Sequence, residues 1–141
     1  MASDFILGPD VYVNASVALG SPPEHVIRRV LGPNKKKTKT TAWILARIEA
    51  MLSNLDAFKP DAVARQMDTI RQFVEVVAED LDHGPDAWVD ALVGAAKACG
   101  AQRVITDHPD LADKTEVDGI EFLSSEAWLL EQTTPPPPPG A

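Results

Sequence analysis

The sequence has little of what marks disulfide-stabilised or membrane-spanning proteins. It contains one cysteine, Cys99, which excludes an intrachain disulfide framework. No run approaches the roughly 18 uncharged apolar residues that a membrane span requires. The N-terminal segment also lacks the basic start and long apolar stretch of a signal peptide. We therefore expect a soluble, cytoplasmic protein with no membrane association.

Positive charge is also scarce. The chain has 13 basic and 21 acidic residues, for a net charge of −8. Such a chain repels polyanions at long range, so any contact with nucleic acid requires a local basic patch. One patch stands out, the segment "NKKKTK", which contains Lys35, Lys36, Lys37 and Lys39. We interpret these lysines either as an RNA-binding patch or as an ordinary solvated loop.

Apolar residues make up 45% of the 141 positions, which is enough to form the core of one domain. Short β-forming runs such as "FIL", "TKTT", "FVEVV", "RVIT" and "EVDGIEFL" alternate with segments of helical periodicity. Ser21, Thr41 and Ser124 or Ser125 are candidate helix caps. This alternation predicts an α/β fold, a three-layer α/β/α sandwich with a mainly parallel four- or five-stranded sheet.

The C-terminal segment "TTPPPPPGA" differs from the rest of the chain. A run of prolines forms neither helix nor sheet and favours an extended polyproline conformation. We therefore predict a folded domain over residues 1–132 and a disordered polyproline tail over residues 133–141. The tail is either a plain chain end or a ligand that docks into an aromatic groove of a partner.

Polar residues follow two of the expected strands. The segment "VITDHPDL" places Thr106, Asp107, His108 and Asp110 after one strand, and "ILGPD" places Asp10 after the first. In open parallel sheets, ligands bind at the carboxyl ends of the strands. We therefore predict a pocket there.

A predicted helix that starts near Asp86 would reach the same pocket and bring Asp90 with it. Simpler interpretations remain open for three of these acids. Asp86 could be a helix cap or first-turn acid, Asp90 a solvated helix residue, and Asp110 a turn residue.

The order and spacing of four segments resemble the PIN domain family over most of the chain. The segments are "ILGPDVYVNA", "TAWILARIEAML", "DAWVDALVGAAKACGAQRVITDHPDL" and "GIEFLSSEAWLLE". The resemblance implies an α/β/α fold. It also implies relatives that are Mg²⁺- or Mn²⁺-dependent ribonucleases, among them toxins of toxin–antitoxin pairs, and it suggests a homodimer. Members hold the metal with acidic side chains, because hard cations bind carboxylate oxygens and activate water.

The sequence departs from the family pattern at most of the acidic positions. Gly8 stands where the first acid is expected, and Asp10 stands on the usual asparagine. Arg47 replaces the expected glutamate of the second segment, whereas Asp90 keeps the third acid. At the fourth position, Asp107 falls on the usual glycine, His108 on the usual aspartate, and Asp110 on the second aspartate.

Our first hypothesis is therefore a catalytically impaired member without a metal cofactor. A guanidinium is always protonated, so Arg47 would act as a built-in cation and pair with Asp10 or Asp90. The module would bind RNA or a protein partner through the strand-end pocket. Exchanging Gly8→Asp together with Arg47→Glu would then increase Mg²⁺ binding.

Two alternatives remain. In the first, the chain is an active endoribonuclease in which Asp10, Asp90, Asp107 and Asp110 supply the catalytic acids. Mg²⁺ or Mn²⁺ would be held by the first three. This requires the strand to continue through Pro9, so that Asp10 points to the same face as Gly8. In the second, the chain is a scaffold or interaction protein recognised through its polyproline tail.

Overall fold

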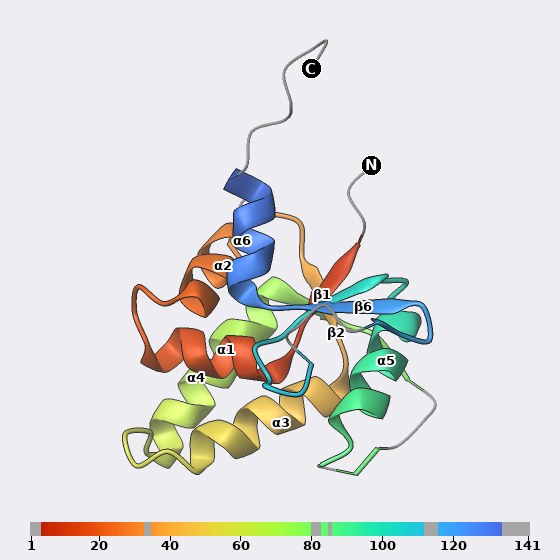
Figure 1. The fold of residues 1–141 in the computed structure, drawn as a ribbon. Coiled ribbons are helices and arrows are strands. Elements are labelled where there is room, and N and C mark those ends of the chain that lie inside the picture. Colours follow the sequence, from red (N-terminus) through yellow and green to blue (C-terminus); the bar gives the residue numbers. More distant parts are fainter. Residues whose placement is uncertain (1–3, 33–34, 80–82, 85, 112–115, 134–141) are drawn as a thin grey trace.

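The computed structural model describes residues 4–32, 35–79, 83–84, 86–111 and 116–133, which form a mixed α/β fold (Figure 1). The helices in this part of the chain are α1 (Pro9–Val17), α2 (Pro22–Val30), α3 (Ala42–Ser53), α4 (Pro60–Phe73), α5 (Trp88–Ala98) and α6 (Ser125–Thr133). The strands are β1 (Phe5–Leu7), β2 (Thr38–Thr40), β3 (Val74–Val76), β4 (Arg103–Ile105), β5 (Glu116–Val117) and β6 (Ile120–Leu123).

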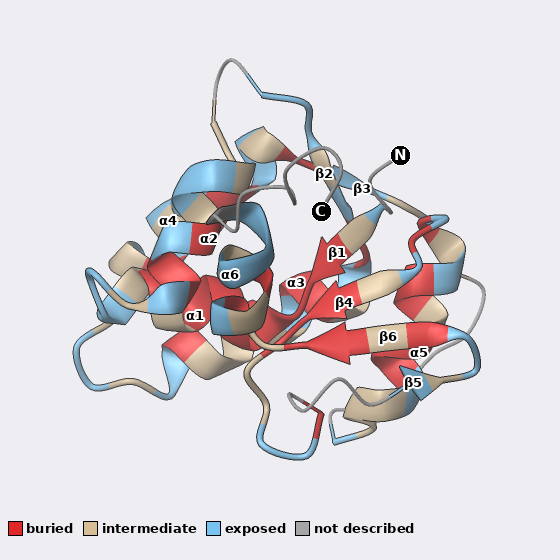
Figure 2. Ribbon diagram, turned by 45° about the horizontal axis from the view of Figure 1, so that its top comes forward, coloured by how far each residue is buried: buried red, intermediate tan, exposed pale blue. Residues whose placement is uncertain are grey.

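The main sheet has four strands in the order β1-β4-β6-β5. Strands β1, β4 and β6 run parallel, with Ile6 opposite Val104 and Val104 opposite Phe122. Strand β5 is antiparallel to β6, so the sheet is mixed. Strands β2 and β3 form a separate parallel pair, and β2 lies next to β1 (Figure 2). Because β4 lies between β1 and β6, and β2 lies next to β1, the ends of these four strands lie close together.

The core lies around the central strands, which are apolar enough to be covered on both faces. Ile6, Leu7, Val104, Ile105, Phe122 and Leu123 are fully buried. Helix α4 covers part of this core with Val63, Met67 and Ile70, the apolar positions at helical spacing in the sequence. The red segments of Figure 2 show how burial concentrates along β1, β4 and β6.

Local sequence signals explain several boundaries. The side chain of Thr41 accepts a hydrogen bond from the amide of Ile44, which confirms the predicted cap of α3. Asp118 and Gly119 have positive φ angles of 52° and 82°. Both angles suit a tight turn between antiparallel strands. The segment "EVDGIEFL" therefore forms a hairpin of β5 and β6 rather than the single strand that we expected.

Other boundaries differ from the expectation. Helix α1 begins at Pro9, directly after the extended Gly8, because proline is favoured in the first turn of a helix. The strand therefore does not continue through Pro9, and Asp10 lies in the first turn of α1. Ser21 precedes α2, yet its hydroxyl donates to the carbonyl of Ala18 and forms no side-chain cap.

The predicted boundary between the folded domain (residues 1–132) and the tail (residues 133–141) lies within α6, which extends through Thr133. The predicted polyproline tail begins at residue 133, and its residues 134–141 are outside the described part of the chain. Across the ranges that the structure describes, no helix is long and apolar enough to cross a membrane.

Candidate functional site

Asp10 is bound by residues at the end of β4. Its Oδ1 accepts a hydrogen bond from the hydroxyl of Thr106 at 2.7 Å, and its Oδ2 accepts one from the amide of Asp107 at 2.7 Å. The Thr106 hydroxyl in turn accepts from the amide of His108 at 3.2 Å. Asp10 is 7% exposed and Thr106 is fully buried. The first turn of α1 is thus fastened to the loop that follows β4.

Asp107 is bound in the same way by the start of α6. Its Oδ1 accepts from the amide of Ser125 at 2.8 Å, and its Oδ2 accepts from the Ser125 hydroxyl at 2.6 Å. Ser124, not Ser125, caps α6, since its hydroxyl accepts from the amide of Ala127 at 3.1 Å. We call Asp10, Thr106, Asp107 and Ser125 the Asp10–Asp107 network. It lies at the carboxyl ends of β1, β4 and β6.

The position of Gly8 explains how Asp10 fits. A side chain at Gly8 would place its Cβ 2.8 Å from Oδ1 of Asp10 and 3.1 Å from Cβ of Thr106. Both distances are shorter than ordinary contact, so the Asp10 carboxylate uses the space that a residue with a side chain would need. The exchange Gly8→Asp therefore cannot add an acid here without displacing Asp10.

Burial governs the charge of this network. Burial raises the pKa of Asp10 above its ordinary value, and the hydrogen bonds from Thr106 and from the Asp107 amide offset part of this increase. The charge of Asp107 raises the pKa of Asp10 further. The site therefore favours a neutral Asp10 more strongly than water does.

Arg47 does not form the ion pair that we expected. The structure contains no salt bridge between Arg47 and Asp10 or Asp90. Its Nε is buried and has no hydrogen-bond partner among the residues that the structure describes. Asp10 is instead satisfied by Thr106 and a backbone amide, which carry no charge. The built-in cation hypothesis therefore lacks its central contact.

The remaining predicted acids point to solvent. Asp86 is exposed and precedes Ala87, which occupies the cap position of α5, so Asp86 is not the N-cap. Asp90 is an exposed acid in the first turn of α5, and Asp110 is exposed in the loop after β4. In the ranges that the structure describes, no three His, Cys, Asp or Glu residues are placed to hold a metal ion. The trio Asp10, Asp90 and Asp107 therefore does not fit Mg²⁺ or Mn²⁺.

His108 takes part in an aromatic cluster. Its ring lies 4.9 Å from that of Trp88, which meets Trp43 edge-on at 5.9 Å. The Trp43 indole N–H donates to the carbonyl of Gly84 at 3.1 Å. Nδ1 of His108 accepts from the amide of Asp110 at 3.3 Å. These contacts hold α3, α5 and the loop after β4 together.

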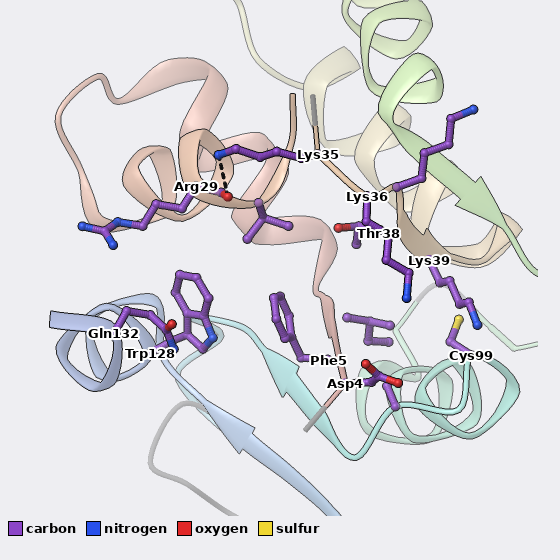
Figure 3. Close-up of a pocket in the computed structure, with 14 residues that line it drawn as sticks. Asp4, Phe5, Arg29, Lys35, Lys36, Thr38, Lys39, Cys99, Trp128 and Gln132 are labelled. Atoms are coloured by element: carbon purple, nitrogen blue, oxygen red, sulfur yellow. Dashed lines mark hydrogen bonds between the residues drawn. The ribbon is translucent and has the colours of Figure 1, made fainter. Parts of the chain in front are cut away.

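A cavity of about 650 Å³ lies at the opposite ends of the strands. Asp4 and Phe5 line it at the start of β1, Thr38 at the start of β2, and Ala101 shortly before β4 (Figure 3). Its five basic lining residues are Arg29, Lys35, Lys36, Lys37 and Lys39. We call it the basic cavity. The lysines of "NKKKTK" therefore lie away from the predicted strand-end pocket.

Most of these cations have no acidic partner. Lys35 donates to the carbonyls of Arg28 and Arg29 at 2.6 Å each and so caps the C-terminal end of α2. Lys36, Lys37 and Lys39 are exposed and form no salt bridge within the described residues. Asp4 is the acid among the lining residues. The basic cavity thus has a local excess of positive charge in an acidic protein.

Two aromatic rings form part of the same lining. Phe5 and Trp128 lie with ring centroids 5.4 Å apart and planes tilted by 53°. Trp128 comes from α6, far from Phe5 in sequence. No local pattern could have brought these residues together. The position of Lys35, Lys36 and Lys37, however, could have been predicted, because they precede β2, and residues before a parallel strand lie at its amino end. Lys39 lies within β2 itself.

No protein-family model and no curated protein sequence matches this chain. Any functional conclusion therefore depends on the residues and contacts of the chain itself.

Proposed function

We propose that this protein is an RNA-binding module with a PIN-like fold that does not cleave RNA by the family's metal-dependent chemistry. The fold assignment combines the sequence resemblance with the parallel pairings of β1, β4 and β6 and of β2 and β3. In this assignment the two sheets belong to one mainly parallel layer between two layers of helices, a three-layer α/β/α sandwich.

The proposed loss of metal-dependent catalysis is supported by one observation. Both oxygens of Asp10 and both oxygens of Asp107 accept hydrogen bonds from Thr106, Ser125 and backbone amides. A metal-dependent nuclease needs several carboxylates that converge on one ion. Here the carboxylates stabilise the ends of α1 and α6 instead. The network therefore has a structural role: it connects the first turn of α1 and the start of α6 to the end of β4.

The charge of the basic cavity supports RNA as the ligand. Arg29, Lys36, Lys37 and Lys39 line one opening, whereas the whole chain carries a net charge of −8. When a phosphate chain contacts such a group of cations, its condensed counterions are released, and this release favours binding. An acidic protein with a basic opening of this kind therefore concentrates its attraction for RNA there.

A titration of single-stranded RNA followed by fluorescence anisotropy tests binding. Four phosphate contacts predict that the logarithm of the binding constant falls with the logarithm of salt concentration with a slope of roughly −3. A slope near zero contradicts the role of the cations. Failure to bind RNA at low salt contradicts the proposal itself.

A cleavage assay with Mn²⁺, repeated with a chelator, tests the absence of metal-dependent catalysis. We expect no chelator-sensitive products from single-stranded or structured RNA. The matched control is Asp10→Asn, which removes the carboxylate that a nuclease would need. Cleavage by the unmodified protein that is lost in this variant would overturn the proposal.

A further inference from the structure

We draw no further inference here: the strongest candidate, the aromatic cluster of Trp43, Trp88 and His108 at the carboxyl ends of the strands, packs its rings against one another, and nothing in the part of the chain that the structure describes shows what covers its partly exposed surface.

Discussion

The polar side chains at the two ends of the parallel strands differ in whether they have bonding partners. At the carboxyl ends, Asp10 and Asp107 accept hydrogen bonds from Thr106, Ser125 and backbone amides. At the amino ends, Lys36, Lys37 and Lys39 surround the basic cavity without an acidic partner among the described residues. A charged group that already has partners stabilises the fold, whereas one without partners can attract a ligand. Changes at the two ends should therefore affect different properties.

The largest expected effect is that of Asp10→Ala. This exchange leaves the Thr106 hydroxyl and the Asp107 amide without their acceptor, and we expect the free energy of unfolding to fall by about 2–3 kcal/mol. Urea denaturation at neutral pH measures the loss. The control is Asp56→Ala, which removes an exposed acid and should change stability little. A loss no larger than that of the control would show that the network does not stabilise the fold.

Gly8→Ala should have the next largest effect. Its added Cβ would lie 2.8 Å from Oδ1 of Asp10, and relieving this overlap should cost about 1–3 kcal/mol of unfolding free energy. Gly84→Ala is the matched control, because no atom of the described residues lies within 4 Å of a Cβ at that position. Equal stability of the two variants would mean that the Asp10 carboxylate has room to move.

The protonation of Asp10 should change the free energy of unfolding by a smaller amount, and the direction of this change with pH can be predicted. Its pKa is raised in the folded state, so its contribution to stability is complete below the unfolded-state pKa of about 3.9 and declines as pH rises through the folded-state pKa. The stability advantage of the unmodified protein over Asp10→Asn should therefore shrink as pH rises above about 4, the unfolded-state pKa. Urea denaturation across this range checks it, and an advantage that grows with pH contradicts the assignment.

Arg47→Met should have the smallest effect, in the opposite direction. The buried Nε of Arg47 has no hydrogen-bond partner in the described part of the chain, so replacing the guanidinium by an apolar chain should leave the unfolding free energy unchanged or raise it by about 1 kcal/mol. Arg65→Met on the exposed face of α4 is the control. A clear loss of stability at Arg47 alone would restore the hypothesis that its charge is compensated in the pocket.

Local signals in the sequence predicted much of the fold. The cap at Thr41 and the apolar spacing in α4 are confirmed, because both depend on neighbours within one or two helical turns. The turn at Asp118 and Gly119 is equally local, although the segment "EVDGIEFL", expected as one strand, forms a hairpin around it. The continuation of the first strand through Pro9, which the nuclease alternative requires, was wrong, because α1 begins at this proline.

The candidate site was less accessible to sequence reasoning. Asp10, Thr106 and Asp107 were placed in one predicted pocket, yet the hydrogen bonds between them and the role of Ser125 could not be predicted, since the pairing of β1, β4 and β6 brings these residues together. The basic cavity joins residues from both ends of the chain, such as Phe5 and Trp128. Such contacts depend on tertiary packing, which no periodicity in the sequence records.

Helix α6 is anchored at both ends. Ser125 at its start is held by Asp107, and Glu131 near its end forms an ion pair with Arg103 at 2.6 Å. Trp128 lies between these two anchors and lines the basic cavity. A helix tied at both ends cannot separate locally from the sheet without breaking one of these contacts, so hydrogen exchange of the α6 amides should require a larger opening than exchange in a helix with a free end.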